Sequence, residues 1–325
     1  MTSQLKTVTR KRKESMQPPE GKVPVVIFIH RRDLHLQKVL CGIRKYRPSR
    51  IFCFADAWEE GNKNEKKQCL RARATLRAGI DWPCRLDLRC AVKKRGLKKN
   101  VETGLTQVFQ KVPHAIVLED DCVPTKEFFR FCEEGLKRHQ SDSKVLSISG
   151  SCFLPMETAV NASAYLSQYP HCWGWATWRR AWRRYSSHYS PVTMRRILER
   201  QNLGREEKKH WQAVIHQIQV GQISSWAYLW MFAHWQNGSR SLNPTSNLVN
   251  NVGFDASAEN TRDVGDRLKT RSHGDIFHQK RKIASDADSI RWDREVFFNH
   301  YRRLSGRLNL IEKILVKLQR FLGKA

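Results

Sequence analysis

Three consecutive carboxylates, Glu119, Asp120 and Asp121, directly follow an apolar run at residues 114–118. Mutual repulsion raises the free energy of ionising all three unless a cation or nearby arginines compensate for it. Carboxylate oxygens are hard ligands that favour Mg2+ or Mn2+, and these ions commonly bridge protein carboxylates and substrate phosphates. The triplet therefore predicts either a divalent-metal site for phosphate chemistry or the acidic start of a helix, where the macrodipole favours the same side chains.

The segments around the triplet alternate between the patterns of strands and helices. Continuous apolar runs at 23–29 and 51–55 are typical of strands buried on both faces of a parallel sheet. Apolar residues at three- and four-residue spacing predict a helix at 36–43. Further helices are expected at 62–78, 101–109 and 128–132, and further strands at 84–90, 114–118 and 145–148. This alternation predicts an α/β fold whose ligands bind at the carboxyl ends of its strands.

The charge of the chain restricts its partners. Its 325 residues include 59 Lys and Arg against 31 Asp and Glu, a formal net charge of +28. A field of this size favours nucleic acid, an anionic membrane or phosphorylated small molecules as partners. The basic residues are spread along the chain without a recognised nucleic-acid-binding motif, which argues against nucleic acid. A non-catalytic protein that binds nucleic acid or a membrane surface remains the alternative.

The nine cysteines indicate the compartment. Their number is odd, their spacing is irregular, and no two stand in a Cys-x-x-Cys pair. This argues against a disulfide framework and a zinc site, and for a reducing compartment. No apolar stretch approaches the ~20 residues of a membrane span. The basic residues 10–13 precede no small-residue cleavage site, so we expect a cytoplasmic protein.

Composition divides the chain into three parts. Residues 1–22 are expected to be a basic tail, residues 23–255 the catalytic domain, and residues 256–325 a basic C-terminal extension. Within the extension, leucines and an isoleucine at spacings of 3, 4, 3 and 4 predict an amphipathic helix at 308–322. This helix either packs on the protein or, through its basic residues, holds the protein at the inner face of an anionic membrane.

Three stretches of the chain carry a resemblance to a known family. They are residues 101–132, which include the triplet, residues 169–182, which include Trp173-Gly174-Trp175, and residues 243–254. Through these stretches, the chain resembles the bacterial hemolysin-like nucleotide-diphospho-sugar transferases. More distantly, it is similar to the N-acetylglucosaminyltransferases that initiate complex N-glycan branching. The resemblance implies a GT-A fold, which is a Rossmann-like α/β fold, and the activity of a metal-dependent glycosyltransferase.

The resemblance also implies roles for single residues. Asp121 would ligate the metal, which would be Mn2+ or Mg2+, while Glu119 and Asp120 would face the sugar and the ribose of the donor. Arg32 stands where the family has an arginine near the nucleotide. Asp56 stands where the family has an aspartate suited to hydrogen-bonding the base. The implied donor is a uridine diphosphate sugar.

The tryptophan-rich segment is a candidate for sugar binding. In sugar enzymes aromatic faces stack on the apolar face of a pyranose, and glycine lets the backbone approach a ligand. Trp173 or Trp175 is therefore expected to line the donor pocket together with Gly174, although some of these rings must also belong to the core. Trp226 is a further donor-site candidate by the resemblance. For His171 we expect a structural or orienting role.

The general base that would deprotonate the acceptor hydroxyl is not identified. Where the N-glycan enzymes have a carboxylate after a tryptophan, this chain has Ala227. Where many relatives have a histidine, it has Asn260. The nearby carboxylates Asp255 and Glu259 are the remaining candidates, and the inverting or retaining outcome stays open. The expected acceptor is a glycan or a lipid-linked glycan in envelope polysaccharide synthesis.

Overall fold

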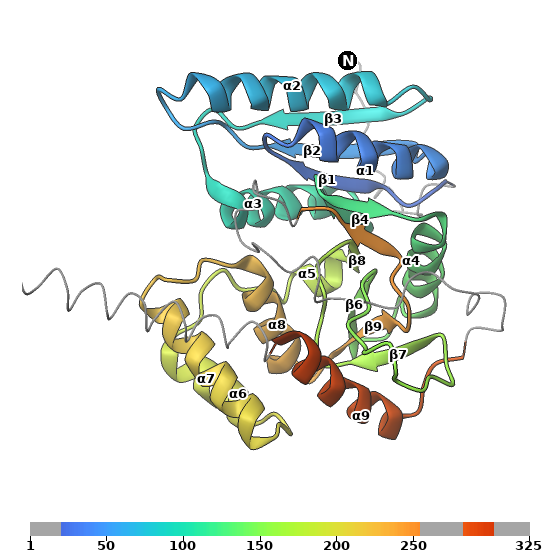
Figure 1. The fold of residues 1–325 in the computed structure, drawn as a ribbon, viewed down its shortest axis with the longest axis vertical. Helices are drawn as coiled ribbons and strands as arrows, with labels where there is room; N and C mark the ends of the chain where they lie inside the picture. Colours follow the sequence, from blue (N-terminus) through green and yellow to red (C-terminus); the bar gives the residue numbers. More distant parts are fainter. Residues whose placement is uncertain (1–20, 254–281, 302–325) are drawn as a thin grey trace, which may run out of the picture.

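Figure 1 shows one large sheet that runs from β3 at the top of the view to β7 near the bottom, with helices packed along it. The structure is a computed structural model, and it describes residues 21–253 and 282–301. The basic tail up to residue 20, the candidate bases Asp255 and Glu259, and the predicted helix at 308–322 lie outside the described residues.

The first half of the sheet is parallel. Its four strands lie in the order β3-β2-β1-β4. Their bounds are Val25–Ile29 (β1), Arg50–Ala55 (β2), Arg85–Cys90 (β3) and His114–Glu119 (β4). The helices that connect them are Asp33–Tyr46 (α1), Lys63–Gly79 (α2) and Gly96–Lys111 (α3). Every residue of β1 is buried, as its continuous apolar run predicts for a central parallel strand.

The strand order reverses between β1 and β4. The chain adds β2 and then β3 on one side of β1, and afterwards crosses back to place β4 on the other side. Because such crossovers are right-handed, α1 and α2 cover one face of the sheet and α3 covers the other. In agreement, α1 packs on α2, while α3 packs on helices of the second half. Such a reversal leaves a crevice at the carboxyl ends of β1 and β4, where α/β proteins bind ligands.

The second half of the sheet is mixed. β8 lies antiparallel between β4 and β6, β9 is parallel to β6, and β7 closes the far edge. The strands are Val145–Ser149 (β6), Ala164–Ser167 (β7), Trp175–Trp178 (β8) and Arg240–Pro244 (β9). The short strands Cys122–Pro124 (β5) and Val249–Asn251 (β10) form a separate antiparallel pair. The remaining helices are Lys126–Arg138 (α4), Arg179–Trp182 (α5), Pro191–Glu199 (α6), Arg205–Gln219 (α7), Trp226–Gln236 (α8) and Asp286–Val296 (α9).

The α/β class and the Rossmann-like arrangement of the first half confirm the prediction from the sequence. Each strand and helix expected between residues 23 and 148 is present, with bounds shifted by a few residues. β8, β9 and α9 are findings of the structure. α9 lies in the segment assigned to a C-terminal extension, yet it packs against β7 and buries Trp292 and Val296 in the core.

The core has two parts. One follows the sheet across both halves and contains aliphatic residues and phenylalanines of β1, β2, β4 and α1, together with tryptophans of β8 and α8. The other lies under α6, α7 and α9 and is rich in Trp, Tyr and Phe. Trp173 and Tyr185 pack against both clusters. None of the nine cysteines, all of which fall within residues 21–253, forms a disulfide. Among the described helices, none has the length and apolar character needed to cross a bilayer.

Candidate functional site

Asp120 lies at the crevice between β1 and β4 and ties the two strands together. Its Oδ2 accepts a hydrogen bond from the backbone N–H of His30, the residue after β1, at 2.9 Å. Only 8% of Asp120 is exposed. Burial, and after it the charge of neighbouring Asp121, raises the pKa of Asp120 to about 7. Asp120 therefore fixes the end of β1, two residues before Arg32.

Asp121 forms an ion pair with Arg32 across the same crevice. Arg32 Nη1 donates to Asp121 Oδ2 at 2.6 Å, and the two side chains are 13% and 14% exposed. The backbone oxygen of Asp121 accepts from the N–H of Val252, just beyond β10. The sequence predicted both residues for the site, and the structure brings them into contact.

Gly253 closes the site on one side. A Cβ at this position would lie 2.2 Å from Asp121 Oδ2 and 3.0 Å from Arg32 Nη1. Any side chain would therefore displace the carboxylate or the guanidinium. The third carboxylate, Glu119, ends β4 and is half-buried.

A second charged cluster adjoins the crevice. The buried carboxylate of Glu65 lies 2.9 Å from Lys94 Nζ, 3.5 Å from His30 Nε2 and 3.9 Å from Arg31 Nη1. Burial alone would raise the pKa of Glu65, but the Glu59 N–H and Lys94 outweigh it and lower this pKa. Sequence reasoning missed this cluster, although Glu65 stands in the first turn of a predicted helix, three residues after the N-cap Asn62.

Asp56 is held by the backbone, which differs from the expected contact with a base. Its Oδ1 accepts from the N–H groups of Ala57 at 2.8 Å and Arg95 at 3.0 Å, and its Oδ2 accepts from Gly96 N–H at 2.8 Å. Asp56 is only 6% exposed. Arg95 and Gly96 begin α3, so this carboxylate satisfies N–H groups that the helix leaves unpaired. Asp56 joins β2 to α3 and has little capacity left for a ligand.

Trp175 and Trp226 are core residues, which corrects their expected contact with the donor. They are 1% and 3% exposed. Their rings stack on each other with centroids 5.4 Å apart, and Trp230 lies 5.7 Å from Trp175. Neither ring has a face available to a sugar. β8 contains Trp175 as a central strand between β4 and β6, so its burial follows from the sheet topology.

Trp173 differs from these two rings because it is partly exposed. Its backbone oxygen accepts from Ser151 Oγ at 2.9 Å, and its ring meets Phe153 edge-on at 5.0 Å. The neighbouring Gly174 has a φ of 68°, and a Cβ there would lie 2.6 Å from Val249 Cγ2. Gly174 thus serves close backbone packing, and Trp173 is the one predicted tryptophan that remains accessible.

His171 has the expected structural position. It is buried, and its backbone N–H donates to Ser149 Oγ at 3.0 Å. Burial, followed by the neighbouring His300, lowers the pKa of His171 well below its usual value, so the ring is neutral at pH 7. A neutral buried imidazole that packs against Phe153 is part of the core.

The carboxylates fit a divalent cation that a substrate helps to hold. In residues 21–253 and 282–301, no three His, Cys, Asp or Glu side chains converge closely enough to hold a metal by themselves. Mg2+ normally takes one or two protein carboxylates and fills its coordination with water and substrate phosphates. Asp121, with Glu119 two residues before it, supplies hard oxygen ligands of this kind. The described residues therefore suit a metal that arrives with a phosphorylated ligand.

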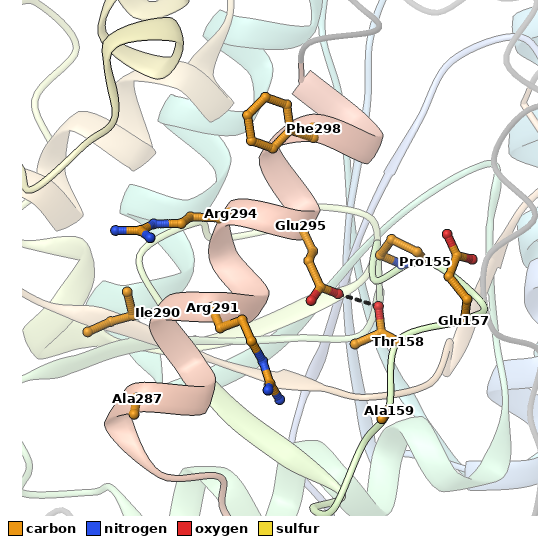
Figure 2. Close-up of a pocket in the computed structure, with 10 residues that line it drawn as sticks. All are labelled: Pro155, Glu157, Thr158, Ala159, Ala287, Ile290, Arg291, Arg294, Glu295 and Phe298. Atoms are coloured by element: carbon orange, nitrogen blue, oxygen red, sulfur yellow. Dashed lines mark hydrogen bonds between the residues drawn. The ribbon is translucent and has the colours of Figure 1, made fainter.

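One cavity of the described residues lies away from this crevice. A groove of about 870 Å³ separates α9 from the loop at residues 155–159. Figure 2 shows its lining, with Ile290, Arg291 and Arg294 on α9, Phe298 above them, and the hydrogen bond from Thr158 to Glu295 across the groove. None of the predicted site residues lines this groove.

Comparisons with known proteins find likeness in structure alone. No protein-family model matches the chain, and no curated protein matches it. The mannosyltransferase PcManGT from Pyrobaculum calidifontis, solved with GDP-Man and Mn2+, is 12% identical, with a TM-score of 0.37 over 68% of this chain and 70% of that chain.

Two further solved structures are similar. A 4-diphosphocytidyl-2C-methyl-D-erythritol synthase from Anaerococcus prevotii is 8% identical, with a TM-score of 0.31 over 85% of this chain and 98% of that chain. An apo UDP-glucose pyrophosphorylase is 9% identical, with a TM-score of 0.34 over 73% of this chain and 94% of that chain. Likeness of this extent carries no argument about activity.

Proposed function

We propose that this chain is a metal-dependent glycosyltransferase of the GT-A type. Its donor is a nucleoside diphosphate sugar, with uridine diphosphate as the carrier, and its acceptor is a glycan or lipid-linked glycan of the cell envelope. One observation carries the proposal. Asp120, Asp121 and Arg32, all predicted from the sequence, lie at the crevice where the strand order reverses, and Glu119 ends the strand that leads there.

Each residue at the crevice has a part in donor binding. Asp121, with Glu119 beside it, would hold Mn2+ or Mg2+. When bound, this cation would stabilise the negative charge that develops on the diphosphate leaving group. Asp120 holds the end of β1 through the His30 N–H, and in this way positions Arg32 for a phosphate oxygen. Trp173, which is partly exposed, is the candidate to contact the sugar.

The acceptor side of the proposal rests on the sequence. Asp255 and Glu259, which follow Gly253, remain the candidates for the general base. The predicted helix at 308–322 would place the enzyme at the inner face of the membrane, where lipid-linked acceptors are found. Flotation with anionic liposomes tests this part, and unchanged binding by a chain that ends before Leu308 would exclude the helix as the anchor.

A thermal-shift panel of nucleotide sugars, with and without Mn2+, tests the donor site. A ligand that binds only the native state raises the melting temperature by mass action. We expect one donor to raise it only when Mn2+ is present, and Asp121→Asn to remove this shift. If folded protein shows no shift with any donor, the proposed function is wrong.

A further inference from the structure

The ion pair between Arg32 and Asp121 occupies one of the two carboxylate oxygens that the proposed metal could bind. Arg32 Nη1 lies 2.6 Å from Asp121 Oδ2, and both side chains are largely buried. Gly253 stands against the same oxygen and the same guanidinium nitrogen, so little space remains around this contact. A metal–oxygen bond to Asp121 would be about 2.0–2.2 Å long for an ion such as Mg2+ or Mn2+.

A metal ion and a guanidinium cannot share this carboxylate oxygen without strong repulsion. Two positive charges about 4 Å apart repel each other appreciably when they are shielded from water. The guanidinium must therefore leave Asp121 Oδ2 before a cation can bind there. In the absence of a metal, Arg32 compensates the negative charge of Asp121. Asp121 follows the buried carboxylate of Asp120, and the two negative charges would otherwise repel each other.

We propose that Arg32 is a built-in counter-ion of Asp121, which the metal displaces and which then binds the diphosphate of the donor. This inference rests on the proposed function and adds to it how the metal and the donor depend on each other for binding. A metal that takes this oxygen alone must break the ion pair, and it brings no anion to replace Asp121 beside Arg32. A metal that arrives with a nucleoside diphosphate offers Arg32 a new anionic partner at once.

The consequence is positive coupling between the two ligands. Each ligand raises the affinity for the other by the same factor, because coupling of binding free energies is reciprocal. Arg32 thus acts as a positioning residue that suppresses binding of the metal alone and favours binding of the metal–nucleotide complex.

Titration of the folded protein with Mn2+, followed by the paramagnetic resonance signal of the unbound ion, tests the inference without any turnover. It is carried out with and without uridine diphosphate, on the natural protein and on Arg32→Gln. For the natural protein, we expect weak binding of Mn2+ alone and binding about tenfold or more tighter with the nucleotide, in the usual range of coupling. For Arg32→Gln, we expect Mn2+ alone to bind about tenfold tighter, and the nucleotide to add little.

Arg31→Gln is the matched control. It removes one positive charge from the adjacent position, but Arg31 lies beside Glu65 and not Asp121. Its Mn2+ titration should resemble that of the natural protein, while Arg32→Lys should restore part of the coupling. Circular dichroism and melting temperature establish that each variant is folded.

The two proposals fail in different ways. If folded Arg32→Gln binds Mn2+ alone no more tightly than the natural protein does, the counter-ion role is wrong and the proposed function stands. If Arg31→Gln tightens Mn2+ binding as much as Arg32→Gln, general electrostatics explains the effect and the role is also wrong. If the natural protein binds no Mn2+ even with the nucleotide, both proposals are overturned.

Discussion

The two halves of the sheet differ in what they bury. The parallel half buries mainly aliphatic side chains and places its charged residues at the ends of β1 and β4. The mixed half carries, beneath α6, α7 and α9, a cluster of aromatic rings with buried histidines beside it, and His210 lacks a hydrogen-bond partner on either ring nitrogen among the described residues. The comparison supports the proposal that the ligand site lies at the strand ends. Trp175 and Trp226 instead pack in the core cluster that includes residues of β1, β2 and β4.

The largest effects are expected from replacing one aspartate in each half of the molecule, Asp121 at the crevice and Asp293 in α9. Asp121→Asn keeps an oxygen for Arg32 but loses a carboxylate ligand, so turnover should fall by about 10²–10³-fold, as when an electrostatic group of an active site is removed. Asp293→Asn, in α9, should leave turnover unchanged. It should lower the free energy of unfolding by about 1–3 kcal/mol, because Asp293 accepts from the Gln168 N–H and the Ser167 hydroxyl.

Turnover at saturating donor and urea denaturation of both variants check this pair. Equal loss of stability in the two variants, with equal loss of turnover, would remove the distinction between the halves.

The tryptophans offer a second contrast. Trp175→Ala should lower the free energy of unfolding by about 3–5 kcal/mol, as is typical of a fully buried aromatic residue. Trp173→Ala should cost less stability, because this ring is partly exposed, and should raise KM for the donor. Denaturation and donor titration measure both effects. If a stably folded Trp175→Phe variant has a raised KM for the donor while KM is unchanged in Trp173→Ala, then Trp175 and not Trp173 contacts the sugar.

The buried histidines predict sensitivity of the mixed half to acid. Burial lowers the pKa of His210 to about 4, from about 6.5 in an unfolded chain. A lowered folded pKa contributes stability that is present above pH 6.5 and is lost as the pH falls toward 4, because the unfolded chain then binds the proton. At pH 5 this loss is about 2 kcal/mol for His210.

His210→Phe should therefore lose less stability between pH 7 and pH 5 than the natural protein, measured by denaturation at each pH. His188→Gln, at an exposed histidine, is the control. An unchanged pH dependence in His210→Phe would show that this ring is already protonated or accessible to water.

The smallest expected effects concern two residues that follow helices. Arg47 follows α1 with a φ of 50°, where a side chain strains the backbone, so Arg47→Gly should stabilise the protein by about 1 kcal/mol. Gly238, after α8, has a φ of 57°, and Gly238→Ala should destabilise by a similar amount, about 1 kcal/mol. Melting temperatures measure both. Loss of stability in Arg47→Gly would mean that contacts of the Arg47 side chain outweigh the strain.

Much of the parallel half could be predicted because most of its strands are continuous apolar runs. Such runs can be recognised in the sequence without knowing which strands lie beside them. Residues 23–29, 51–55 and 114–118 each become a strand, and the residues at their ends meet as expected. Asp121 and Arg32 were predicted for the site and lie in contact there.

The rest depended on tertiary contacts that spacing does not reveal. β8 begins with Trp175, one of the tryptophans expected to line the donor pocket, and its place between β4 and β6 and its burial show that Trp175 is core. From the sequence, Asp56 resembled a ligand-binding carboxylate. The N–H groups of Arg95 and Gly96, which donate to it, lie about forty residues later in the chain, so nothing in the sequence indicated them. α9 lies in a segment that is polar in sequence, and the packing of buried Trp292 against Tyr165 stabilises the helix in its position.

The place of β8 in the sheet also bears on how the chain folds during synthesis. Synthesis runs from the N-terminus, so the residues of β1 to β4 are made well before residues 175–178. Until then, the outer edge of β4 has no neighbouring strand and presents unpaired backbone groups. The interval between the synthesis of β4 and that of β8 is therefore the stage at which a nascent chain is most exposed to aggregation and to chaperones.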